Sequence, residues 1–204
     1  MRKKIFFIGI NVAIFLIACQ NDNKEKHEYK MTGEADSTQK LPDSLLKHVS
    51  PSFAQLDPRV STACSSIVNH YLALKNALAN DDGSAAANAG AAMSTEIKNF
   101  DIVLLNEEQK KLYNSFSDDM KENAEHISES GKDIGHQREH FSMLSDEVLQ
   151  LVKGFGGGRM LYVENCPMAF EDKGAIWLSE FKEVKNPYFA RPMTECVKIE
   201  EIVR

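Results

Sequence analysis

The stretch DIGHQREHFSMLSDEVLQLVKGF, residues 133–155, decides the fold because one set of its side chains recurs at alternating steps of three and four residues. Such steps place side chains on one face of an α-helix, which has ~3.6 residues per turn. That face contains Ile134, Gln137, Phe141, Leu144, Val148, Leu151 and Phe155. The glycines at positions 156–158 end the pattern. The sequence therefore predicts a long amphipathic helix that begins near Asp133.

Three upstream segments, residues 60–78, 84–104 and 106–127, carry the same helical period. Ser84 is a candidate N-cap for the second of them, and Asn106 with Gln109 has the spacing of a capping box for the third. Short loops between such helices favour antiparallel neighbours. We therefore expect a mainly α fold, an antiparallel up-down four-helix bundle.

A C-terminal tail of different character follows, from about 160 to 204. Two short apolar runs, residues 160–163 and 175–178, are typical of strands between turn-rich loops. We expect the tail to be irregular or β structure packed on the end of the bundle.

The N-terminal residues have the pattern of an export signal. Arg2, Lys3 and Lys4 precede an apolar stretch, residues 5–18, that is shorter than the ~20 residues of a membrane span. The stretch ends at Cys19 in Leu-Ile-Ala-Cys, which resembles the lipobox of bacterial lipoprotein signal peptides. That resemblance implies removal of residues 1–18, lipidation of Cys19, and a membrane anchor on the periplasmic side of the outer membrane.

The polar composition of residues 20–57 predicts a flexible tether between this anchor and a folded domain at 58–204. The chain has 24 Lys and Arg against 30 Asp and Glu, a net charge of −6, which argues against a nucleic-acid-binding module. Neither a nucleophile elbow nor a phosphate-binding loop occurs in the sequence. We therefore expect no enzyme activity.

Four sulfur-containing residues of the tail form a candidate metal site: Cys166, Met168, Met193 and Cys196. Thiolate and thioether ligands select Cu(I). The alternative is a disulfide between Cys166 and Cys196, since an exported protein folds in an oxidising compartment. The residues alone leave both possibilities open, and they indicate that Cys64, on the apolar face of the first helix, is an inert core thiol.

Histidines form a second candidate site. His136 and His140 are four residues apart and so lie on one face of the last helix, where both can bind one ion. His126 lies on the preceding helix, near the same end of the bundle if the connection is tight. The alternative is a set of solvated histidines on a polar face.

The motifs Cys-Pro-Met-Ala at 166–169, Met-x-x-Cys at 193–196 and His-Gln-Arg-Glu-His-Phe at 136–141 resemble an uncharacterised bacterial domain family. That family occurs on lipoproteins and at the C-terminus of periplasmic adaptor subunits of copper/silver efflux pumps. The resemblance runs from about residue 60 to 200. It implies copper as the ligand and an efflux adaptor as a partner.

Three hypotheses for function follow. The first is a lipid-anchored periplasmic protein that binds Cu(I) for buffering or for transfer to an efflux adaptor. The second is a non-enzymatic interaction module, a disulfide-stapled helical bundle that docks on a partner in the envelope. The third is a small-molecule sensor with a cavity in the bundle, suggested by the mixed side-chain sizes around the Ala-rich second helix.

Overall fold

The protein is mainly helical, with a small mixed sheet. The computed structural model describes residues 42–189 and 197–204. The helices are α1 (Pro58–Ala79), α2 (Gly83–Lys98), α3 (Glu107–Asn114), α4 (Ser117–Glu129), α5 (Ile134–Phe155) and the short α6 (Ala169–Asp172). The strands are β1 (Lys47–Val49), β2 (Leu161–Cys166), β3 (Ala175–Ser179) and β4 (Lys198–Val203), and two 3-10 turns lie at Asp43–Leu45 and Ile102–Leu104.

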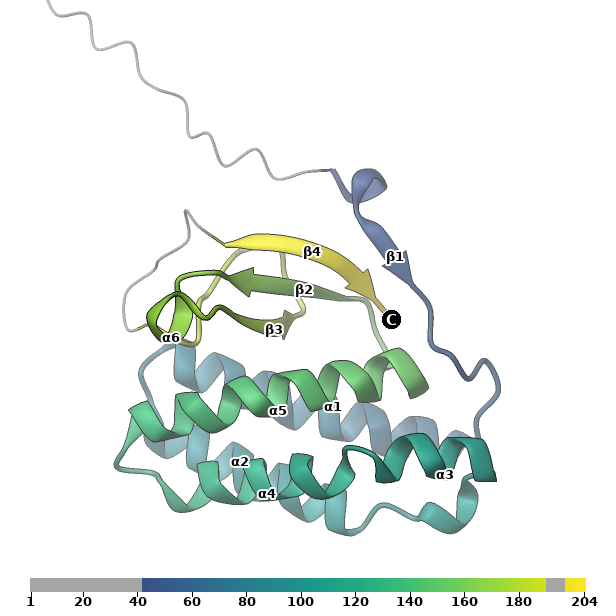
Figure 1. The fold of residues 1–204 in the computed structure, drawn as a ribbon. Helices are drawn as coiled ribbons and strands as arrows, with labels where there is room; N and C mark the ends of the chain where they lie inside the picture. Colours follow the sequence, from purple (N-terminus) through teal and green to yellow (C-terminus); the bar gives the residue numbers. More distant parts are fainter. Residues whose placement is uncertain (1–41, 190–196) are drawn as a thin grey trace, which may run out of the picture. The chain divides into compact units, whose positions relative to one another are not determined.

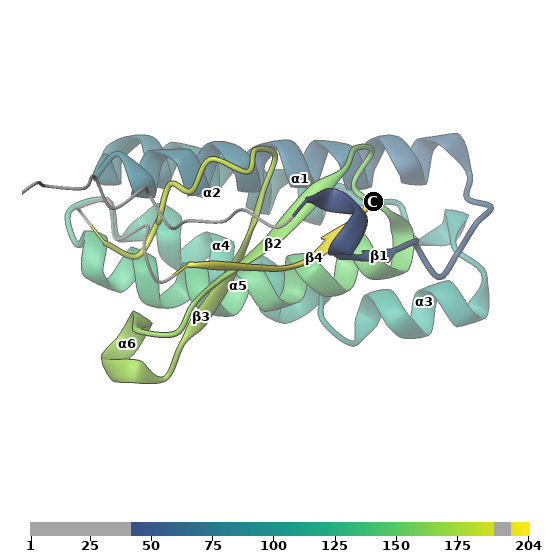
Figure 2. The ribbon, with the colours of Figure 1, turned by 90° about the horizontal axis from the view of Figure 1, so that it is seen from above.

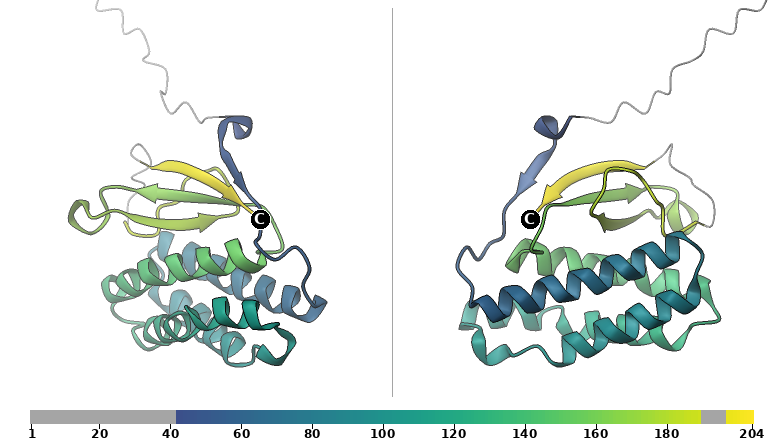
Figure 3. Two further views of the ribbon diagram at one scale, coloured as in Figure 1. Left: turned by 45° about the vertical axis from the view of Figure 1, so that its right-hand side comes forward. Right: turned by 180° about the vertical axis from the view of Figure 1, so that it is seen from behind.

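The long helices contact one another in a cycle. Helix α1 packs on α2, α2 on α4, α4 on α5, and α5 on α1. The sheet covers the side of this group formed by α1 and α5, while α2 and α4 lie on the far side (Figures 1 and 3). Seen from above, β2 and β3 run obliquely across the helices (Figure 2). The expectation that the tail packs on the end of the helices was therefore wrong, because the sheet lies along their length.

The helix boundaries follow the sequence pattern with two corrections. Helix α5 begins next to Asp133 as predicted, with the Asp133 side chain as its cap. Asp82 rather than Ser84 caps α2, and Asp82 accepts a hydrogen bond from the backbone N–H of Ala85. The predicted third helix is two helices, α3 and α4, with a break at Ser115 and Phe116. Serine competes for nearby backbone groups, and its hydroxyl here donates to a carbonyl of the preceding turn.

The sheet has the strand order β1-β4-β2-β3. Strand β2 pairs antiparallel with β3 and with β4, whereas β1 pairs parallel with β4. A bulge between Val163 and Glu164 interrupts the pairing of β2 with β4. Sequence analysis predicted strands near the positions of β2 and β3, and it missed β4 and β1.

Part of the predicted tether is folded. Strand β1 lies within residues 20–57, and the backbone N–H groups of Ser52 and Phe53 donate to the carbonyls of Lys153 and Gly154. These carbonyls belong to the last turn of α5, where no helical N–H is left to satisfy them. The ring of Phe53 also packs on Phe155, with centroids 5.3 Å apart. The described fold therefore begins well before Pro58.

A buried tyrosine joins the sheet to the helices. The hydroxyl of Tyr71, on α1, lies 2.8 Å from Ser145 Oγ on α5 and accepts a hydrogen bond from the backbone N–H of Leu178 on β3. Its ring stacks on Phe141, with centroids 5.2 Å apart. Trp177 of β3 is fully buried in the same apolar cluster. Helices and sheet thus share one core.

Among the described residues, every helix is too short or too polar to traverse a lipid bilayer.

The capping box at the start of α3 is present as predicted. The side chain of Asn106 accepts from the N–H of Gln109, and the Gln109 side chain accepts from the N–H of Asn106. Asn106→Ala is expected to lower the free energy of unfolding by about 1 kcal/mol, because it leaves an N–H of the first turn without a partner. Urea denaturation measures this loss. The exposed Asn114→Ala, at the other end of α3, is the control and should change stability less.

Candidate metal centre

Three histidines from two consecutive helices meet at one end of the α4–α5 pair. His126 lies in the last turn of α4, and His136 and His140 lie in the first two turns of α5. Each has one potential ligand atom within 4.8 Å of the others. All three are exposed or half-buried, so an ion from solvent can reach them. The structure thus brings together the histidines that sequence analysis selected.

The rings pack on one another. His126 and His140 are stacked, with centroids 4.4 Å apart and planes 4° from parallel, and His136 meets His140 edge-on at 4.5 Å. Two nitrogens bound tetrahedrally to one Zn²⁺ or Cu⁺ ion at ~2.0 Å lie ~3.3 Å apart. The present separations, up to 4.8 Å, are wider than this, so the imidazoles would have to turn toward a common point to form a three-nitrogen site.

Residues next to the two α5 histidines fix the start of this helix. The carboxylate of Asp133 accepts from the N–H of His136. The amide of the buried Gln137 donates to the carbonyls of Gly83 and Ile127, which ties α5 to α2 and to the end of α4. This explains why a polar residue occupies the core face at 137, and it holds the histidines on a rigid support.

Arg138 secures the opposite side of the same turn. Its guanidinium donates to the carbonyls of Leu78 and Pro187 and pairs with Asp81 at 2.9 Å. Gln137 and Arg138 therefore point to neighbouring segments and leave the flank of the helix to His136 and His140.

Acidic side chains surround the histidines. Glu139 lies 3.6 Å from His136 Nδ1, and Glu122 lies 3.7 Å from His126 Nε2. Both carboxylates are exposed, so water screens their interaction with the imidazoles. They would supply negative charge beside a cation at this point.

His140 has an environment that keeps it neutral. Partial burial, followed by the neighbouring His126 and His136, lowers the pKa of His140 from its ordinary value. Its Nδ1 lies 2.8 Å from Oδ1 of Asn123, a buried residue of α4. A neutral imidazole is the form that binds metal, so this histidine needs no deprotonation near neutral pH.

The two described members of the predicted sulfur site differ in burial. Cys166, at the end of β2, is completely buried in the apolar core and forms no disulfide with another described cysteine, whereas Met168 is 46% exposed. Met193 and Cys196 lie outside the described residues. The disulfide between Cys166 and Cys196 and the four-sulfur site both stay predictions.

Cys64 is a buried core thiol, as predicted. It is free and fully buried on α1, and burial raises its pKa to about 12. The thiol is therefore neutral at physiological pH, which is typical of an inert core cysteine.

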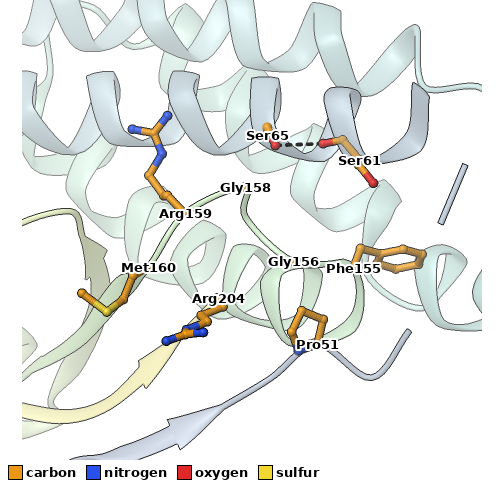
Figure 4. A pocket seen from close by; sticks show the side chains of 9 residues that line it. All are labelled: Pro51, Ser61, Ser65, Phe155, Gly156, Gly158, Arg159, Met160 and Arg204. Atoms are coloured by element: carbon orange, nitrogen blue, oxygen red, sulfur yellow. Dashed lines mark hydrogen bonds between the residues drawn. The ribbon is translucent and has the colours of Figure 1, made fainter. Parts of the chain in front are cut away.

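A pocket of about 490 Å³ lies at the other end of α5, beside the loop that leads into β2 (Figure 4). Gly158 borders it with φ 71°, and a Cβ there would lie 2.2 Å from Ser65 Oγ, so only glycine fits. Its two arginines point away from each other (Figure 4). Arg159 donates to Asn69 on α1. The pocket therefore lacks polar groups that converge on one point.

Residues 67–159 match the family model described as a protein of unknown function (DUF3347). The match contains the three histidines of the candidate metal centre and ends before β2, so it does not include the Cys-Pro-Met motif at 166–168. No curated protein and no solved structure matches the chain. The similarity to this family therefore concerns the helical part and carries no activity with it.

Proposed function

We propose that this protein binds one copper ion at the metal centre formed by His126, His136 and His140. The observation that carries the proposal is the set of three imidazole nitrogens within 4.8 Å of one another. They lie on two helices whose termini are fixed by hydrogen bonds rather than on a mobile loop. Imidazole is a ligand common to copper and zinc.

Met143 favours copper over zinc. It lies three residues after His140 and seven after His136, which places it on the same side of α5, and its side chain is 46% exposed. A thioether is a soft ligand that binds Cu(I) and contributes little to Zn²⁺ binding. Three imidazoles with one thioether would complete a four-coordinate site for Cu(I).

The proposed role is metal buffering or transfer, without catalysis. The signal-like residues 1–18 and Cys19 support an exported, lipid-anchored protein that faces the periplasm. The likeness to a domain found on copper/silver efflux adaptors supports such an adaptor as the partner. The cycle of contacts among α1, α2, α4 and α5 supports an up-down four-helix bundle as the scaffold.

Metal titration of the purified full chain tests the proposal. Under reducing conditions we expect one Cu(I) per chain in competition with a chromophoric chelator. His136→Ala and His140→Ala should each lower the affinity by more than about 100-fold, the upper end of what loss of an outer-sphere partner costs. Met143→Leu should weaken Cu(I) binding and leave Zn²⁺ binding unchanged.

The control is His70→Ala, which removes a histidine of α1 that is not in the cluster. It should leave both affinities unchanged. If Cys166→Ser and Met193→Leu abolish binding while the histidine variants retain it, the site is the sulfur cluster of the tail. If no variant and no wild-type protein binds metal, the proposal is wrong.

A further inference from the structure

A chain of two hydrogen bonds extends from the metal centre into the protein. His140 Nδ1 lies 2.8 Å from Asn123 Oδ1, and Asn123 Nδ2 donates to Glu147 Oε1 at 2.9 Å. His140 and Glu147 are seven residues apart, two turns of α5, and Asn123 reaches between them from α4. Asn123 and Glu147 are both buried, so water does not compete for these bonds.

While Glu147 is ionised, the order of donors and acceptors along this chain has one solution. A carboxylate oxygen accepts, so the amide of Asn123 directs its NH₂ group to Glu147 and its oxygen to His140. The reverse orientation would place the amide oxygen against the carboxylate oxygen. A neutral imidazole has one N–H, and here it must be on Nδ1, since that nitrogen faces an acceptor. The lone pair of His140 is then on Nε2.

The arrangement holds when Glu147 takes up a proton. Glu147 Oε2 is buried and has no hydrogen-bond partner among the described residues. A proton on Oε2 leaves Oε1 free to accept from Asn123, so protonation of that oxygen keeps the orientation of the amide.

We propose that Asn123 and Glu147 are positioning residues that hold His140 in the Nδ1–H tautomer, so that Nε2 is presented as the metal ligand. The role of Nε2 as ligand rests on the proposed metal-binding function, whereas the tautomer itself is a property of the metal-free chain. Metal-binding histidines generally donate their second N–H to a fixed acceptor, which orients the ring. Here the acceptor is an amide whose own direction is set by a buried carboxylate.

Long-range ¹H–¹⁵N NMR spectra of the metal-free full chain, labelled with ¹⁵N-histidine, test this directly. In the wild type we expect His140 to be a single Nδ1–H tautomer. Asn123→Leu removes the acceptor and should convert His140 to a mixture with a large Nε2–H population. Glu147→Leu, which leaves the amide free to turn, should cause a smaller shift in the same direction.

Asp146→Asn is the matched control, because it removes a negative charge from the same turn of α5 without touching the amide. It should leave the tautomer of His140 unchanged. His126 and His136 serve as internal references and should keep their spectra in all variants. Asn123→Leu should also weaken metal binding by ~10- to 100-fold.

An Nε2–H tautomer in the wild type would overturn the proposal, and so would an unchanged tautomer in both Asn123→Leu and Glu147→Leu. The wild-type spectrum decides even if a variant does not fold. A tautomer that shifts as expected in a chain that binds no metal would support the positioning roles and refute the metal-binding function.

Discussion

Gly90→Leu is expected to lower the free energy of unfolding by about 3 kcal/mol. Gly90 lies on α2 where this helix meets α4, and a Cβ there would lie 2.9 Å from the carbonyl oxygen of Ala124. It would also lie 3.2 Å from Ile127 Cγ2. Because the nearest atom belongs to backbone, α4 itself must move, and overpacking of this kind costs ~1–3 kcal/mol or more.

Urea denaturation at neutral pH measures this loss. Asn88→Leu is the control, since it places the same side chain on the exposed face of the same helix and should change stability by less than ~0.5 kcal/mol. The displaced α4 carries Asn123 and His126, so Gly90→Leu should also weaken metal binding. If Gly90→Leu and Asn88→Leu lower the free energy of unfolding equally, the packing of α2 on α4 does not depend on their close approach at Gly90.

Glu147→Gln is expected to raise the free energy of unfolding by about 3 kcal/mol at pH 8 and to leave it unchanged at pH 4. Burial raises the pKa of Glu147 to about 7 from its ordinary value of 4.5, and Asp119 and Asp146 act in the same direction. The hydrogen bond from Asn123 opposes them. The folded protein therefore binds this proton more tightly than the unfolded chain does.

Stability consequently falls as the pH rises from 4.5 to 7. Each unit of pKa difference corresponds to ~1.4 kcal/mol, which gives a cost of about 3 kcal/mol above pH 7. Glutamine carries no charge, and its Oε1 still accepts from Asn123, so the variant avoids this cost.

Urea denaturation of wild type and Glu147→Gln at several pH values checks the prediction. The exposed Glu139→Gln, on the same helix, should give parallel stability curves for variant and wild type at all pH values. If Glu147→Gln raises the free energy of unfolding equally at pH 4 and pH 8, the ionised carboxylate of Glu147 is not what destabilises the wild type. The retention of an unfavourable buried carboxylate is consistent with its proposed role in orienting Asn123.

Sequence alone predicted the long helices well because their stripes are regular. The steps from Val60 to Leu78 and from Ile134 to Phe155 each follow one face, and the side chains at the ends of these stripes are buried or half-buried. Gln137 is the polar residue on this face, and its side-chain amide donates hydrogen bonds to carbonyls of two other segments. The break at Ser115 was missed because apolar residues continue at helical spacing through Phe116 and Met120.

The sheet was harder to predict because its partners are distant in the sequence. Strand β1 is three residues long and carries no strong alternation, and its pairing with Glu201 to Val203 joins segments separated by more than the whole helical part. Short strands of this kind are defined by tertiary contacts and not by local preference. The same holds for the docking of Ser52 and Phe53 on α5.

In the histidine cluster, the three candidate ligands could be found from sequence spacing, whereas the residues that orient them, Asn123 and Glu147, could not. Asn123 and Glu147 lie in polar stretches that are typical of solvent-facing helix surfaces. One signal was available in the sequence, namely the seven-residue step from His140 to Glu147, which places both on the same side of the helix. The partner that joins them comes from another helix, and a single sequence does not reveal that contact.

The parallel pairing of β1 with β4 has a practical consequence for any shortened version of this protein. A chain started at Pro58 would keep every long helix, yet it would remove one of the two neighbours of β4 and leave the final carbonyls of α5 uncovered. The bare strand would then be free to recruit a second molecule. Truncation should therefore begin upstream of Lys47, or aggregation will be mistaken for a property of the native protein.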